Sequence, residues 1–94
     1  MTTINKTITE NGTIEYKNED GELHREGGPA VISPNGYEAW CKNGQYHRED
    51  GPALIWPDGM KEWFLNGELH REDGPAIKHS DGSVEWYLNG KKIK

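Results

Sequence analysis

The stretch "WCKNGQYHREDGPALIWPDGMKEW", which runs from Trp40 to Trp63, contains one full period of a pattern that recurs every 23 residues. Within it, the box "HREDGPA" starts at His47; the box returns at His70, and a variant, "HREGGPA", starts at His24. Other positions keep the same spacing, namely Gly36, Gly59 and Gly82; Trp40, Trp63 and Trp86; and Asn43-Gly44, Asn66-Gly67 and Asn89-Gly90. A fixed period over most of the chain is typical of a repeat architecture, in which stacked units bury a shared core.

The chain of 94 residues is expected to form one domain built from tandem units of this period. An early, degenerate copy is visible, because Gly12 precedes Tyr16 by the same four residues that separate Gly36 from Trp40. The expected division of the single domain, 1–94, is an N-terminal edge strand at 1–11, units at about 12–35, 36–58 and 59–81, and a shortened unit at 82–94.

Two-residue turn signals separate short runs that are rich in aromatic and branched residues, such as "YEAWCK" (37–42) and "KEWFL" (61–65). Asn-Gly and Asp-Gly pairs favour the type I′ hairpin turn, because both residues tolerate positive φ. These pairs are Asn11-Gly12, Asn35-Gly36, Asn43-Gly44, Asp58-Gly59, Asn66-Gly67, Asp81-Gly82 and Asn89-Gly90. No stretch shows helical periodicity. The sequence therefore predicts an all-β fold, an extended antiparallel β-meander of tandem hairpins in a single-layer twisted sheet.

Alternation along the strands sorts the side chains onto two faces of this sheet. One, the Trp face, carries Tyr16, Trp40, Trp63 and Trp86 together with Ile14, Leu65, Val84 and Leu88, although Lys42 and Lys61 also lie on that side. We expect its rings to stack on one another as an aromatic ladder and to form the core. The other, the mixed face, differs from unit to unit and carries Tyr37, Ala39 and Cys41; Met60, Glu62 and Phe64; and Ser83, Glu85 and Tyr87.

The repeated histidines do not fit a metal site. Equivalent positions in successive units are expected two strands apart, or about 9.6 Å, so that His24, His47 and His70 span about 19 Å. Zinc–nitrogen bonds are only about 2.0–2.1 Å long, so one ion cannot gather all three imidazoles. We expect no metal and no cofactor.

The box is also a poor candidate for catalysis, because active sites usually form once, from different residues, in a pocket. The stretch "HSD" at 79–81 contains residue types of a catalytic triad. Neighbours in one turn, however, cannot converge as nucleophile, base and orienting group. Cys41 lies in mid-strand beside Trp40, where a small inert residue is usual. The protein is therefore predicted not to be an enzyme.

A structural joint between units explains the box better. The glycine before each proline, as at Gly51, is expected in a backbone conformation that is closed to other residues, and proline opens a strand well. In each box the alanine fits beneath an indole, the arginine pairs with carboxylates, and the histidine donates a ring N–H to a backbone carbonyl. Gly27 stands where the later joints have Asp50 and Asp73, so the first joint is expected to lack one acceptor.

The stretches "YEAWCKNGQYH…PDG" and "KEWFLNGELH…SDG" resemble MORN-type repeats, which have a period of about 23 residues, a G-x-W-x-x-G-x-x-H core and a closing Asp-Gly turn. The variant with "HREDGPA" after the Asn-Gly turn is similar to one found in small bacterial and bacteriophage proteins. The resemblance covers nearly the whole chain after residue 11. It implies an extended antiparallel sheet that serves as a scaffold or binding surface, and it implies no particular activity.

Charge and cysteine content limit the partners and the compartment. A net charge of -5 disfavours nucleic acid and anionic membrane as partners, because both attract clustered Lys and Arg. A single cysteine fits a reducing compartment. The N-terminal stretch "MTTINKTITE" lacks the apolar run of a signal peptide, and no segment approaches the roughly 18 apolar residues of a membrane span. We expect a cytoplasmic protein, located in the host cytoplasm if it is encoded by a phage.

Specificity is expected at positions that do not repeat. Trp56 is the clearest, because its counterparts are Ser33 and His79. The predicted binding residues on and beside the mixed face are Tyr37, Trp56, Met60, Phe64 and Tyr87. They predict a non-enzymatic protein-binding module, in its narrower form a small phage-type inhibitor of a bacterial defence enzyme, and a homodimer formed through the mixed face. The alternative is that these residues only cover the second face under a loop or the N-terminal strand.

A second class of function stays open at this stage, the sequestration of a small molecule such as a nucleotide. In it, Arg25, Arg48 and Arg71 would be the anion-binding residues that hold phosphates, and aromatic rings would stack on the base. A mimic of nucleic-acid charge is a weaker alternative, because eleven Lys and Arg interrupt the negative charge.

Overall fold

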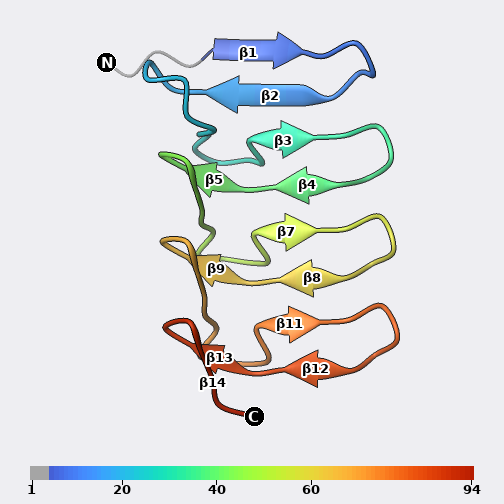
Figure 1. Ribbon diagram of the computed structural model, residues 1–94, viewed down its shortest axis with the longest axis vertical. Helices are drawn as coiled ribbons and strands as arrows, with labels where there is room; N and C mark the ends of the chain where they lie inside the picture. The colour runs from blue at the N-terminus through green and yellow to red at the C-terminus, as the bar shows by residue number, and fades with distance from the viewer. Residues whose placement is uncertain (1–4) are drawn as a thin grey trace.

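The computed structural model describes residues 5–94 and is all-β, with no helix in this part of the chain (Figure 1). The strands in this range are β1 (Asn5–Ile8), β2 (Ile14–Lys17), β3 (Val31–Ile32), β4 (Glu38–Ala39), β5 (Cys41–Lys42), β6 (Gln45–Tyr46), β7 (Leu54–Ile55), β8 (Lys61–Glu62), β9 (Phe64–Leu65), β10 (Glu68–Leu69), β11 (Ile77–Lys78), β12 (Val84–Glu85), β13 (Tyr87–Leu88) and β14 (Lys91–Lys92). The predicted all-β antiparallel fold is confirmed.

Eight strands form one antiparallel sheet in the order β1-β2-β3-β4-β7-β8-β11-β12. The chain adds one hairpin at a time to this sheet, and after β3-β4, β7-β8 and β11-β12 it forms a smaller hairpin beside it, β5-β6, β9-β10 or β13-β14 (Figure 1). At the N-terminal edge, β1 pairs with β2 from Asn5↔Lys17 to Ile8↔Ile14. The predicted edge strand at 1–11 therefore has β1 at its centre, and its first four residues lie outside the described range.

Each repeated tryptophan is the point at which the chain leaves the large sheet for the small hairpin. The N–H of Trp40 donates to the carbonyl of Ala53, just before β7 of the large sheet, at 2.7 Å. The carbonyl of Trp40 accepts from the N–H of His47 in its own hairpin at 3.0 Å. The same two bonds recur at Trp63. Residues before the indole thus pair within the large sheet, and residues after it pair within the small hairpin.

The Asn-Gly and Asp-Gly pairs form two kinds of turn. At Asn43-Gly44, Asn66-Gly67 and Asn89-Gly90 both residues have positive φ, as the predicted type I′ turn requires. At the other four pairs only the glycine does, so the type I′ prediction is wrong there. In the second kind, Gly36 N–H donates to the Ser33 carbonyl at 3.0 Å. Pro34 occupies the second position, which suits a type I turn that ends in a left-handed glycine.

The buried core lies on the mixed face. Its members are Ala30, Val31, Ala39, Cys41 and Leu54, with Leu23, Tyr37 and Phe64 packed against them. Pairing places Val31 and Leu54 on either side of Ala39, so one row of side chains excludes water. Burial raises the pKa of the Cys41 thiol to about 11, as expected for the inert residue that the sequence predicted.

The prediction of a core on the Trp face is wrong. The tryptophans are only half-buried, and Val84 is 45% exposed. The register explains the difference, because it brings charged residues into the same row as the branched ones. That row runs Ile14, Ile32, Glu38, Ile55, Lys61, Lys78 and Val84.

Candidate binding surfaces

The arginine of each box stacks on the aromatic ring of its own unit. The guanidinium carbon of Arg48 lies 3.7 Å from the ring centroid of Trp40. That of Arg71 lies 4.1 Å from the ring centroid of Trp63. In the first unit, Arg25 lies 4.0 Å from the ring of Tyr16. These distances are within the range of cation–π attraction.

Arginines therefore occupy the space between units where the sequence analysis expected ring-on-ring stacking. The aromatic pairs among residues 5–94 are Tyr37–Trp56 and Tyr46–Phe64, and neither involves a repeated tryptophan. The predicted ladder of stacked indoles is wrong. A guanidinium is flat and tolerates stacking, so it fills the gap between strands of neighbouring units while its polar edges stay available for hydrogen bonds.

A glycine closes the other side of each guanidinium. A Cβ atom on Gly51 would lie 2.8 Å from Arg48 Cζ, and one on Gly74 would lie 2.7 Å from Arg71 Cζ. These glycines do not have positive φ, so the predicted reason for them is wrong. Glycine is needed because the arginine packs directly against the backbone.

The edges of the guanidinium groups are bonded within each joint. Arg48 donates from Nη1 to the carbonyl of Pro52 at 3.1 Å and from Nε to Asp50 at 3.0 Å. Arg71 makes the same two bonds to Pro75 and Asp73. Arg25 keeps the bond to Pro29 at 3.2 Å but, among the described residues, has no carboxylate partner. The acceptor expected to be missing from the first joint is indeed missing.

The histidines fasten each unit to the turn of the next. His47 Nδ1 accepts from the backbone N–H of Asn66 at 3.0 Å, and His24 accepts from that of Asn43 at 2.9 Å. The expected donation to a carbonyl is therefore wrong: the neighbouring type I′ turn presents an N–H, and the imidazole supplies the acceptor. Within residues 5–94 no three His, Cys, Asp or Glu side chains lie close enough together to hold a metal ion.

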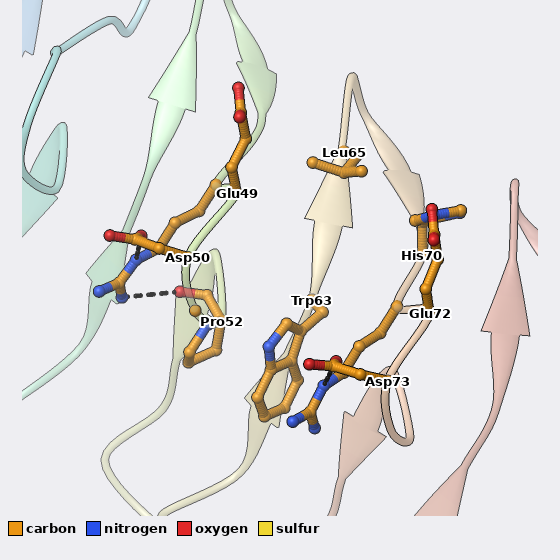
Figure 2. Close-up of a pocket in the computed structure, with 11 residues that line it drawn as sticks. Glu49, Asp50, Pro52, Trp63, Leu65, His70, Glu72 and Asp73 are labelled. Atoms are coloured by element: carbon orange, nitrogen blue, oxygen red, sulfur yellow. Dashed lines mark hydrogen bonds and ion pairs between the residues drawn. The ribbon is translucent and has the colours of Figure 1, made fainter.

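Two grooves separate the three joints. The second groove, of about 650 Å³, lies between the joints at 47–53 and 70–76 and includes Trp63 in its lining. Figure 2 shows Trp63 between Pro52 of one joint and Asp73 of the next. The first groove, of about 440 Å³, lies between the joints at 24–30 and 47–53 and includes Trp40.

A different surface, the aromatic patch, lies over the core on the mixed face and consists of Tyr37, Tyr46, Trp56, Met60 and Phe64. Trp56 is 37% exposed, and its ring centroid lies 4.8 Å from that of Tyr37 at a tilt of 52°. Its Nε1 donates to Glu62 at 2.7 Å. Trp56 and Met60 line an open hollow of about 480 Å³. Burial, and next the nearby Tyr46, raise the pKa of Tyr37 to about 12.

The other predicted binding residues divide between this patch and a polar cluster. Phe64 is half-buried and lies 5.3 Å from Tyr46, measured between ring centroids. Tyr87 lies apart, where its hydroxyl donates to Glu85 at 3.3 Å. Glu85 also contacts His79 Nε2 at 2.6 Å and Lys92 Nζ at 3.4 Å. The structure thus brings together four of the five predicted residues, and Tyr87 is not among them.

Sequence reasoning missed Tyr46, which is 38% exposed and belongs to the patch. Its place could have been found, because it lies opposite Cys41 across the two-residue turn at Asn43-Gly44.

Neither a protein-family model, nor a curated protein, nor a solved structure matches the chain. The described residues contain no helix that could span a membrane.

Proposed function

We propose that this protein is a non-enzymatic protein-binding module and that the aromatic patch is its docking surface. The observation that carries the proposal is the state of Trp56, a large exposed ring that is fixed in place. The ring of Tyr37 packs against it at a tilt of 52° and its Nε1 donates to Glu62, so little side-chain freedom is left to lose on binding. Rigid, partly exposed tryptophans are frequent anchors of protein interfaces.

The fold itself does not need an indole at this position. The backbone N–H of Trp56 donates to the carbonyl of Met60 at 2.9 Å. Ser33 and His79 make the equivalent bond at 2.9 and 2.8 Å, so serine or histidine supports the same turn. Because the turn forms equally well without it, the tryptophan is better explained by contact with a partner.

A narrower form of the proposal is an inhibitor of a bacterial enzyme, which acts by covering a surface of its target. The support for it is the resemblance to small bacterial and bacteriophage repeat proteins together with the small size of the chain. It remains secondary to the docking role of the patch, because the patch would bind any protein of complementary shape.

The test is capture of a partner from bacterial lysate by the immobilised protein, with Trp56→Ser as the decisive variant. Serine occupies this position in the first unit, so the variant is expected to fold. We expect the partner to be retained by the wild type and lost with Trp56→Ser. Val84→Ser, which removes an exposed apolar residue from the Trp face, is the matched control and should retain it. Equal capture by the wild type and Trp56→Ser would contradict the proposal.

The nucleotide alternative is less well supported. It requires Arg48 and Arg71 to hold phosphates, but both guanidinium groups are already bonded to a carboxylate and a backbone carbonyl. A phosphate would have to displace these partners, so we do not propose such a site at these two joints.

A further inference from the structure

We propose that the first groove contains a binding site for a carboxylate group, centred on Arg25. The three joints of the chain allow a direct comparison. In the second and third, an aspartate oxygen accepts from the arginine Nε at 3.0 Å. In the first, Gly27 stands in place of the aspartate, and Arg25 Nε has no acceptor among residues 5–94.

Three of the four contacts that hold Arg48 and Arg71 are also present at Arg25. Tyr16 lies under one face of the guanidinium at 4.0 Å, and Nη1 donates to the Pro29 carbonyl at 3.2 Å. The backbone of Gly28 packs against the other face, since a Cβ there would lie 2.9 Å from Arg25 Cζ. The guanidinium is therefore fixed in direction, while its Nε has no acceptor within residues 5–94.

There is room for a ligand beside it. Apart from Gly27 and its two chain neighbours, no heavy atom lies within 4 Å of a Cβ built on Gly27, so the space beside this left-handed residue (φ 78°) is open. This opening belongs to the first groove, whose lining includes Arg25, Gly27 and Lys42. A small carboxylate can reach Arg25 from solvent without moving the backbone.

The charge of the first groove also favours an anion. Its lining has three cationic side chains, Arg25, Lys42 and Arg48, and three carboxylates, Glu26, Glu49 and Asp50. The lining of the second groove has two cationic side chains, Arg48 and Arg71, and four carboxylates, Glu49, Asp50, Glu72 and Asp73. With histidine neutral, the first groove is balanced and the second has a net charge of two negative units. Lys42 contributes to the difference, because its counterpart in the second groove is Leu65.

The ligand class follows from the group that accepts from the arginine Nε in the second and third joints. Since an aspartate carboxylate accepts from Nε in the other two joints, the matching ligand is one carboxylate, such as the side chain of Asp or Glu in an acidic segment of a partner. The site lies on the Trp face, away from the aromatic patch, and does not depend on the docking role proposed for that patch.

The test follows the Nε–Hε signals of Arg25, Arg48 and Arg71 by NMR while sodium acetate is added at constant ionic strength. We expect a saturable shift at Arg25 and none at the other two. Gly27→Asp should weaken acetate binding about tenfold or more, the effect of one charge-assisted hydrogen bond. Gly27→Ala places a side chain on the same left-handed backbone (φ 78°) without a carboxylate, and it should retain the response. Asp50→Gly should create a response at Arg48.

Three results would overturn the proposal: equal shifts at all three arginines, an unchanged Arg25 response in Gly27→Asp, or no new response at Arg48 in Asp50→Gly. The last variant keeps the test decisive if Gly27→Asp does not fold. A parallel titration uses inorganic phosphate. If phosphate saturates the Arg25 shift at a lower concentration than acetate does, the preferred ligand is a phosphate group. This result would also overturn the proposal.

Discussion

At the scale of single residues, the arginine of each box is held by a ring on one side and a glycine on the other. The same three contacts, to ring, glycine and proline carbonyl, recur at Arg25, Arg48 and Arg71. A half-buried cation–π contact is worth about 0.5–2 kcal/mol, so the three together contribute substantially to a domain whose total stability is small. The arginines thus have a structural role, and only Arg25, which lacks a carboxylate partner, keeps an N–H edge without an acceptor among residues 5–94.

Gly51→Ala is predicted to push the Arg48 guanidinium away from Trp40. The added Cβ overlaps Arg48 Cζ, so the cation–π contact and the bond to Asp50 are strained or lost. We expect the free energy of unfolding, measured by urea denaturation, to fall by about 1–2 kcal/mol. In an Arg48→Ala background the overlap is absent, and the same substitution should be neutral or stabilising by up to about 1 kcal/mol. An equal loss in both backgrounds would show that the packing explanation is incorrect.

The carboxyl of Glu85 is predicted to make stability depend on acidic pH. The hydrogen bond from His79, and next Lys92, hold the pKa of Glu85 below its usual value of 4.5. A lowered pKa in the folded state means that this contribution is present above about pH 4.5 and is lost as the pH falls through the folded pKa. The difference in Tm between the wild type and Glu85→Gln should therefore shrink on acidification. A difference that stays constant with pH would contradict this assignment.

At the scale of elements, the sequence was informative about strands and less so about their contacts. The all-β fold and the three type I′ turns followed from the 23-residue period and the Asn-Gly pairs. The other four turns were mispredicted, because each is a three-residue loop, such as 34–36 between Ser33 and Tyr37, and not a two-residue loop. The core was placed on the wrong face because the tryptophans suggested burial. Pairing between strands, which brings Lys61 opposite Lys78, cannot be derived from one strand alone.

For the candidate surfaces too, the sequence indicates which residues take part but not all of their contacts. Trp56, Tyr37, Met60 and Phe64 could be selected from the sequence, because they occupy positions that vary between units. Tyr87 has the same pattern but bonds to Glu85, and this contact depends on a side-chain direction that alternation does not determine. The open edge of Arg25 was foreseen from Gly27, whereas the contribution of Lys42 required the grooves to be compared in three dimensions.

The type I′ turns are predicted to depend on the left-handed conformation of their asparagines. Asn66 has a φ of 50° and Gly67 one of 84°. Asn66→Ala should lower the free energy of unfolding by about 1–2 kcal/mol, the cost of a left-handed residue with a Cβ and no local hydrogen bond. Asn66→Gly keeps the backbone N–H that donates to His47 and should cost little. Thermal or urea denaturation of both variants tests this, and equal losses would mean that the side chain of Asn66 matters for another reason.

At the scale of the whole molecule, the protein is a thin slab of 39 × 29 × 17 Å. Its radius of gyration is 13.8 Å, against about 12.4 Å for a compact globular chain of this length. The side chains exposed by 1% or less, within the described part, are all alanines: Ala30, Ala39, Ala53 and Ala76. In a slab with so small a core, covering the mixed face adds more to stability than it would in a globular domain. The aromatic patch is the part of that face that is still exposed.

A second copy of the chain is predicted to cover this face. A twofold symmetric dimer would place each Trp56 against the patch of the other copy, and a stable interface needs about 800 Å² from each partner. Light scattering should then give twice the single-chain mass of 10.7 kDa at high concentration, and Trp56→Ser should shift the equilibrium to the monomer. Association through the sheet edge is distinguished by Ile8→Lys in β1, where Ile8 is 65% exposed. Because charge at a strand edge blocks edge pairing, this variant would abolish an edge dimer and leave a face dimer intact. A mass of 10.7 kDa at all concentrations would contradict the dimer and leave the patch free for a different protein.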